Sequence, residues 1–301
     1  MSIFNKPSRS INQQIADLKA HGLDISDTQL AEHWLQHVSY YRLSGYWLPF
    51  ELPKGTSGPR FVTGTQFETA ASLYEFDRRL RLLMIDAIER LEVAFRGSWA
   101  YQLAQATGPH GYLNASLYTD RSLFHSNFGR LARDVGESRE TFMKHYRAKY
   151  DEPVMPPVWM VAEIMSLGQL SRWYALLDSP SLRNAIAKPL GLHESVFVPF
   201  VRHLATVRNT CAHHGRLWNR RFLINFKIPN QPTKLAQSLV NPSPSPAAIY
   251  NTLVIMIFLI EHANPGSGWR GRLKAHLKSH PTSDAAAMGF PVNWESMPMW
   301  R

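Results

Sequence analysis

The stretch VRNTCAHHGRLWNR, which starts at residue 207, brings an arginine, an asparagine, a thiol and two histidines into one short segment. A zinc site needs His, Cys or carboxylate ligands that converge on one ion. His213 and His214 are adjacent, so on a helix their side chains point about 100° apart and cannot clasp one ion together. Cys211 is the only cysteine, and the stretch has no H-x-x-x-H or H-E-x-x-H spacing. We therefore expect no metal and no cofactor here.

The same residue types suit cleavage of RNA without a metal. That reaction needs a base for the 2′-hydroxyl proton, an acid for the leaving 5′ oxygen and a fixed cation for the phosphorane-like transition state. Histidine titrates near neutral pH, and arginine stays ionised and grips two phosphate oxygens. Arg208 and His213 supply this pair. Asn209 precedes His213 by four residues, so on a helix it shares its face and can orient the imidazole or donate to phosphate.

A structural interpretation stays open beside the catalytic one. Arginines and histidines at the C-terminal end of a helix also favour the helix dipole and its free carbonyl groups. One chain moreover supplies a single arginine–histidine set, whereas a scissile phosphate needs groups on more than one side. Two chains that meet about a two-fold axis would place two sets across one cleft, which predicts a homodimer.

Charge favours a polyanionic partner. The chain has 301 residues and a formal net charge of +10. No Asp or Glu occurs between Glu194 and Glu261, a window that contains the arginine–histidine stretch. A basic surface of this kind attracts RNA phosphates. The candidate RNA-binding residues in this window are Arg202, Arg216, Arg220 and Arg221.

Apolar periodicity predicts an all-α fold. The longest helical rhythm runs over residues 66–105, and a second helix is predicted over 194–213, with Gly215 as its stop signal. Further helices are expected over residues 11–21, 28–38, 121–150, 158–177, 247–262 and 269–280, with a proline-rich loop over 241–248. We expect residues 1–60 to form an N-terminal helical extension packed on a helical domain of residues 61–301. That domain ends in a basic helix and an aromatic tail.

No segment predicts export or membrane insertion. The most apolar run, TLVIMIFLI from Thr252 to Ile260, is far shorter than the roughly 20 residues that span a bilayer. The N-terminus has no apolar core of signal-peptide length, and the single cysteine forms no disulfide within the chain. We therefore expect a cytoplasmic protein without a membrane partner.

Several separated segments carry a family resemblance. RNTCAHHGRLWNR resembles the R-N-x-x-A-H-H-x-R-L-W-N-R signature of the Abi family, the bacterial abortive-infection proteins of the AbiD and AbiF type. Four further segments are similar to elements of that family, in the same order: SYYRLSGYWLPF (39–50), IERLEVAFRGSWAY (88–101), WMVAEIMSLGQLSRWY (159–174) and MGFPVNW (288–294). Ordered matches over nearly the whole chain are far more specific than one motif.

The resemblance implies a HEPN-like helical bundle with an R-x4-H motif. It implies a dimeric, metal-independent endoribonuclease that leaves 2′,3′-cyclic phosphate and 5′-hydroxyl ends and acts as a toxin or abortive-infection effector in phage defence. The catalytic set becomes Arg208, His213 and Asn209, with possible support from His214, Glu89, Arg90 and Glu163. A regulatory non-coding RNA or an antitoxin is an implied partner. The alternative is a non-catalytic RNA- or protein-binding helical module, because such domains also occur without activity.

Overall fold

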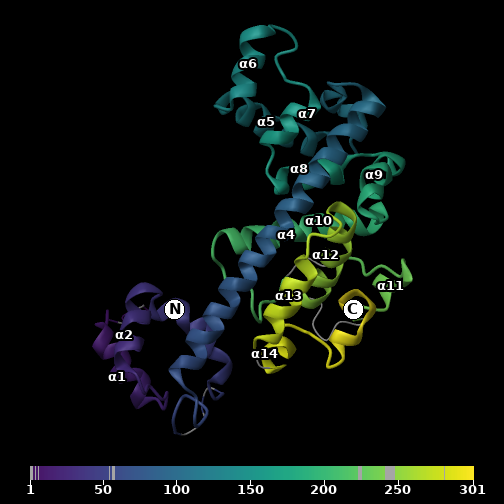
Figure 1. The fold of residues 1–301 in the computed structure, drawn as a ribbon. Helices are drawn as coiled ribbons and strands as arrows, with labels where there is room; N and C mark the ends of the chain where they lie inside the picture. The colour runs from purple at the N-terminus through teal and green to yellow at the C-terminus, as the bar shows by residue number, and fades with distance from the viewer. Residues whose placement is uncertain are drawn as a thin grey trace. The chain divides into compact units, whose positions relative to one another are not determined.

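The computed structural model describes residues 3, 5, 7–53, 55, 58–222, 226–240, 248–280 and 282–301. Over these residues the chain consists of helices and their connections, with three isolated β-bridges and no strand (Figure 1). The predicted all-α fold class is therefore confirmed. The chain forms two compact units, residues 1–79 and 80–301, and helix α4 (Phe67–Thr107) contributes to both. The division into an extension and a domain at residue 60 stays a prediction.

The first unit contains three short helices before α4 begins. A serine and an aspartate start the first two: Ser10 forms a capping box with Gln13, and Asp27 accepts a hydrogen bond from the Leu30 N–H at 2.9 Å. The predicted helix start at Asp27 is thus confirmed. These helices are α1 (Ile11–Ala20), α2 (Thr28–His37) and α3 (Tyr40–Trp47). Their buried side chains include Leu18 and Trp47, which makes a small apolar core.

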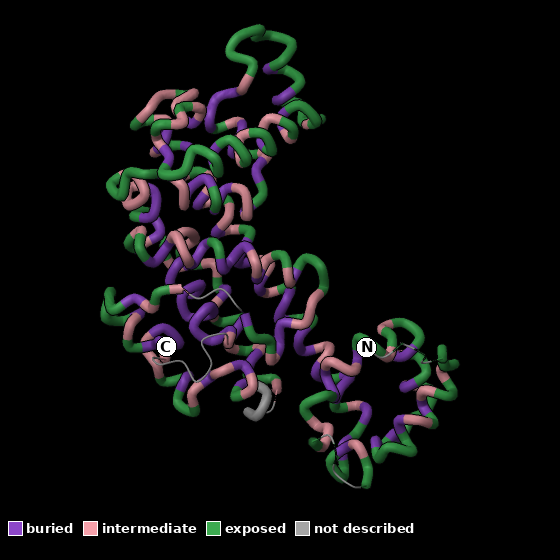
Figure 2. Tube along the Cα trace, turned by 180° about the vertical axis from the view of Figure 1, so that it is seen from behind, coloured by how far each residue is buried: buried purple, intermediate pink, exposed green. Residues whose placement is uncertain are grey.

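The second unit holds the rest of α4 and all later helices. Their bounds are α5 (Arg121–Glu137), α6 (Thr141–Lys149), α7 (Val158–Ile164), α8 (Leu167–Leu176), α9 (Pro180–Ala187), α10 (Glu194–Ala212), α11 (Thr233–Ala236), α12 (Ile249–Ala263), α13 (Trp269–Lys278) and α14 (Thr282–Ala287). Every residue of α12 from Ile249 to Ile260 is buried, so this helix is a central core element (Figure 2). No helix within the described residues combines the length and apolarity needed to cross a bilayer.

Two predicted helices are each divided in the structure. Residues 158–177 form α7 and α8 because Ser166 starts a new helix: it caps the Gln169 N–H, and the Gln169 side chain accepts from the Ser166 N–H at 2.8 Å. Residues 121–150 form α5 and α6, and Arg147 on α6 donates to the carbonyl of Val135 at the end of α5 at 2.8 Å. The predicted proline-rich loop lies, up to residue 247, outside the described residues.

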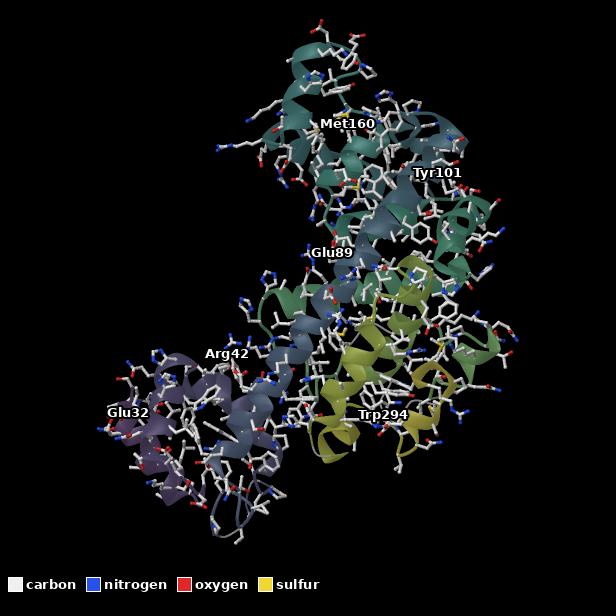
Figure 3. All side chains as sticks on the ribbon, in the orientation of Figure 1. Glu32, Arg42, Glu89, Tyr101, Met160 and Trp294 are labelled. Carbon is white, nitrogen blue, oxygen red and sulfur yellow. The ribbon has the colours of Figure 1, made fainter. Side chains whose placement is uncertain are left out.

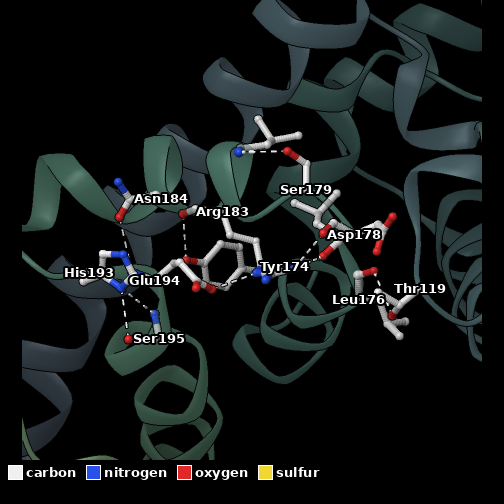
Figure 4. A network of polar contacts seen from close by, with 12 residues as sticks. Thr119, Tyr174, Leu176, Asp178, Ser179, Arg183, Asn184, His193, Glu194 and Ser195 are labelled. Carbon is white, nitrogen blue, oxygen red and sulfur yellow. Dashed lines mark hydrogen bonds and ion pairs between the residues drawn. The ribbon is translucent and has the colours of Figure 1, made fainter.

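A polar network fixes where α10 begins (Figure 4). The Arg183 Nε on α9 donates to Glu194 Oε2 at 2.8 Å, and the same guanidinium donates to the carbonyl of Leu177. The Tyr174 hydroxyl on α8 donates to the carbonyl of Arg183 at 2.8 Å. The first turn of α10 is therefore tied to α8 and α9, and the helix carries the arginine–histidine stretch to its other end.

Candidate functional site

The C-terminal end of α10 separates the two adjacent histidines. The helix ends at Ala212, and His213 keeps a near-helical backbone as its cap, with its N–H donating to the Asn209 carbonyl at 3.0 Å. His214 takes a left-handed conformation with φ 58°, and the Gly215 N–H closes the turn on the Thr210 carbonyl at 2.8 Å. This reversal, which begins at His214 rather than at the predicted Gly215, takes His214 out of the helical register. Only His213 still follows the periodicity that places it beside Asn209.

Arg208 lies between the helix end and α4. Its Nη1 donates to Asn209 Oδ1 at 3.0 Å, and its Nε lies 4.0 Å from Glu92 Oε2. About a third of the side chain is exposed (34%), whereas Glu92 is nearly buried (15%). Glu92 also pairs with Arg96 at 2.6 Å, and Arg96 donates to the carbonyl of Ala162 on α7. The Arg208 guanidinium is thus positioned by a chain of charged groups that links α10, α4 and α7.

A cleft of about 430 Å³ opens beside Arg208. Its walls come from α4, α7 and α10, and they are formed by Ile85, Ile88, Glu89, Glu92, Val93, Arg96, Glu163 and Arg208. Glu89 and Glu163 are exposed carboxylates, and Figure 3 places Glu89 part-way along α4. The structure therefore brings the predicted Glu89 and Glu163 to the same cleft as Arg208.

Arg90 belongs to a different arrangement. Its guanidinium donates to Asp86 Oδ1 at 3.0 Å, and the other Asp86 oxygen accepts from Arg272 on α13 at 2.7 Å. Burial by itself would raise the pKa of Asp86. The hydrogen bonds and charges of Arg90 and Arg272 together have the larger, opposite effect, so the pKa lies below its ordinary value. The Asp86–Arg272 contact thus joins α4 to α13, and Arg90 supports the Asp86 carboxylate from within α4 rather than lining the Arg208 cleft.

Glu92 and Arg96 are site residues that motif spacing did not single out. They follow Glu89 by one and two helical turns, so the face of α4 that carries Glu89 also carries them. This helical periodicity is the sequence signal that could have added Glu92 and Arg96 to the predicted site. Which face of α4 meets α10, however, depends on packing between helices far apart in the sequence.

The predicted RNA-binding arginines divide into two groups. Arg202 is exposed in the middle of α10, seven residues before Asn209 and therefore on the same side of the helix. Arg216, Arg220 and Arg221 follow the helix end. Arg220 donates to the Arg216 carbonyl at 3.5 Å and stacks over the Phe222 ring at 5.7 Å. Arg220 and Arg221 are exposed, and the buried Trp218 anchors their segment.

Histidines spaced for a metal occur elsewhere, on α2. His33 and His37 are four residues apart, and their ring centroids lie 4.5 Å apart. Within the part of the chain that the structure describes, no three His, Cys, Asp or Glu side chains are grouped as metal ligands. The two rings contact each other at an interplanar angle of 55° on one face of α2.

Comparisons with known proteins place the chain in a family. No curated protein and no solved structure matches it significantly. The family described as Abi-like protein matches residues 33–219, which is more than half of the chain. The matched range includes the α4 face with Glu89 and Glu92, Glu163 on α7, and the whole of α10 with Arg208 and His213. The chain therefore belongs to the Abi-like protein family.

Proposed function

We propose that this protein is a metal-independent endoribonuclease of the HEPN type that acts as an effector in bacterial phage defence. Its family supports an abortive-infection or defence role. The observation that carries the chemistry is the end of α10, where Arg208 is held by Asn209 and Glu92 while His213 remains exposed next to Asn209. A fixed cation and an accessible imidazole are two of the three groups that cleavage at phosphorus requires, the third being the general acid.

In the proposed reaction His213 accepts the proton of the ribose 2′-hydroxyl. The 2′ oxygen attacks the adjacent phosphorus and forms a new P–O bond, and the bond from phosphorus to the 5′ oxygen breaks. The 5′ oxygen takes a proton from a general acid, so the products are a 2′,3′-cyclic phosphate and a 5′-hydroxyl. Arg208 neutralises the charge that builds up on the phosphoryl oxygens, and Asn209 orients the guanidinium through its 3.0 Å hydrogen bond.

A second copy of the chain would supply the general acid. Arg208 and His213 are five residues apart, which is about 140° around a helix, so a phosphate must sit across the helix end to touch both. One face of that phosphate is then open. The same histidine of a second copy, facing it across a two-fold axis, completes the acid–base pair in a homodimer.

The decisive test compares three alanine variants in the presence of EDTA. Purified wild-type protein should generate RNA fragments with cyclic-phosphate ends, and Arg208→Ala and His213→Ala should each abolish them while the helical circular dichroism stays unchanged. His214→Ala is the matched control, because His214 has left the helical register, and it should retain cleavage. If Arg208→Ala and His213→Ala cut RNA at the wild-type rate, the mechanism is wrong.

A non-catalytic RNA- or protein-binding module is the second candidate. The 4.0 Å approach of Arg208 to Glu92 favours it over catalysis, because a neighbouring carboxylate offsets part of the positive charge that would stabilise the transition state. Such a module would retain RNA in EDTA without new RNA ends. Sequencing RNA ends in cells that express the wild type or His213→Ala distinguishes the two functions and identifies the RNA that is cut.

A further inference from the structure

Three arginines meet where α5, α8 and α10 adjoin. Arg130 on α5, Arg172 on α8 and Arg202 on α10 are all exposed. Among the described residues, none of the three side chains forms an ion pair or a hydrogen bond. Arg130 and Arg172 do not line the Arg208 cleft and have no role in the proposed cleavage reaction. Helix α8 packs against both α5 and α10 (Figure 1), which brings the three positions to one surface.

Two interactions set the register of α5 on α8. The Gln169 Nε2 donates to Asp134 Oδ2 at 2.5 Å, and the Trp173 ring packs edge-on against Phe124 with centroids 5.7 Å apart. Helices α8 and α5 therefore run antiparallel at this contact. Arg172 lies between Gln169 and Trp173, and Arg130 lies one turn before Asp134. The opposite senses of the two helices thus bring these two arginines to neighbouring turns.

Helix α10 also packs against α8 and carries the third arginine. The rings of Tyr174 and Phe197 pack 5.7 Å apart and join the two helices. Burial lowers the pKa of Arg172, and repulsion from Arg130 and Arg202 lowers it further. Arg172 therefore lies within the electrostatic reach of both other arginines, and none of the three forms an ion pair with a carboxylate among the described residues.

The face of α10 leads from this group to the candidate catalytic residues. Asn209 and His213 follow Arg202 by seven and eleven residues, which are nearly whole numbers of helical turns. They lie about 10 Å and 16 Å from it along the helix axis. No Asp or Glu follows Glu194 on this helix, so nothing on α10 repels a polyanion between Arg202 and His213.

We propose that Arg130, Arg172 and Arg202 bind the sugar-phosphate backbone of an RNA strand a few nucleotides from the phosphate at His213. The choice of RNA as the ligand of this cluster rests on the proposed function. Three guanidinium groups without carboxylates release condensed counterions when they bind a phosphate backbone, and the planar fork of each one fits two phosphate oxygens. The cluster thereby sets the direction of the strand along α10.

The test measures RNA binding separately from RNA cleavage. Full-length His213→Ala protein is titrated with fluorescein-labelled single-stranded RNA at several KCl concentrations, and anisotropy is read. Adding Arg130→Gln, Arg172→Gln or Arg202→Gln should weaken binding several-fold and reduce the salt slope by about 0.7 for each phosphate that is no longer neutralised. Arg172→Lys keeps the charge and should weaken binding less than Arg172→Gln does.

Arg121→Gln is the matched control. Arg121 is exposed on the same helix as Arg130, and its separation of nine positions from Arg130 places it on the opposite face of α5. The RNA affinity and the salt slope of the Arg121→Gln variant should equal those of the parent, the His213→Ala protein into which the substitution is introduced. The cluster proposal is overturned if the three cluster variants behave as Arg121→Gln does, or if the parent binds no RNA at low salt.

The two proposals fail in different ways. If wild-type protein cleaves RNA in EDTA and the cluster variants bind and cleave as the control does, the ribonuclease stands and the cluster is wrong. If wild-type protein never cleaves RNA but Arg172→Gln weakens its RNA binding, the cluster stands and the ribonuclease is wrong. Thermal unfolding of each variant, expected at or above the parent temperature because repulsion is relieved, verifies that the fold is intact.

Discussion

Two arginine-containing regions of the second unit differ in how their charges are balanced. Around the cleft, Arg208 and Arg96 both approach Glu92, at 4.0 Å and 2.6 Å. At the junction of α5, α8 and α10, Arg130 and Arg172 have no carboxylate partner among the described residues. The first region holds its guanidinium groups in place through ion pairs, whereas in the second neither arginine forms an ion pair.

This difference indicates different tasks. A guanidinium paired with a nearly buried carboxylate is fixed in position, which suits a group that must meet one transition state. Unpaired guanidinium groups at the surface repel one another and are relieved only by an external anion, which suits binding along a chain of phosphates. The same residue type is thus organised for positioning in one region and for attraction in the other.

Arg208 should give the largest effect. Arg208→Ala is expected to reduce the rate of RNA cleavage by about 10²–10³-fold, the usual reduction when one transition-state charge donor is removed. Arg208→Lys should recover little, because an ammonium group lacks the rigid planar fork that lets a guanidinium donate to Asn209 and to two phosphate oxygens in fixed directions. Single-turnover cleavage rates measure this. Full activity in the lysine variant would mean that Arg208 acts only as a diffuse positive charge.

Arg96 should give the largest effect on stability among the arginines compared. Its side chain is only 11% exposed and joins Glu92 to the Ala162 carbonyl, so Arg96→Ala deprives both of these acceptors of their donor. The expected decrease is about 2–3 kcal/mol of unfolding free energy, measured by urea denaturation. Arg172→Ala, which removes an exposed arginine of the other region, is the control. Equal decreases in the two variants would contradict the contrast between the regions.

Asp86 tests charge balance through pH. Its carboxyl pKa is below the ordinary value of about 3.9, so the ionised form is favoured in the folded state. The resulting stabilisation is complete above the unfolded pKa and disappears as pH falls through the folded pKa. Wild-type protein should therefore unfold at a higher temperature than Asp86→Asn near pH 7, and the gap should close below about pH 4. A gap that is constant with pH would show that Arg90 and Arg272 do not stabilise this charge.

Relief of repulsion at Arg172 should give the smallest effect. Arg172→Gln removes the charge that Arg130 and Arg202 repel and should raise the unfolding free energy by no more than about 0.5 kcal/mol, because exposed charges are screened. High salt should abolish the gain. Denaturation curves at low and high KCl measure it. A destabilised variant would reveal a structural role for Arg172 and remove the argument that its charge is kept for a ligand.

Much of the site could be predicted from local patterns. Arg208, Asn209 and His213 stand within six residues, so one helix end places them whatever the rest of the chain does. Glu89 and Glu163 were predicted from matching segments, and both line the Arg208 cleft. Arg90 was predicted with them but points to Asp86, because adjacent residues on a helix face different directions.

Amino-acid sequence by itself determined the helical class, the long span of α4, the helix start at Asp27 and the set of chemical groups at the end of α10. These features depend on spacing, capping and composition, which act over a few residues. Tertiary structure alone decided that Glu92 and Arg96 line one cleft with Arg208 and that Arg130, Arg172 and Arg202 meet. The physical reason is that such groupings depend on how distant helices pack, and helical periodicity specifies a face without specifying its neighbour.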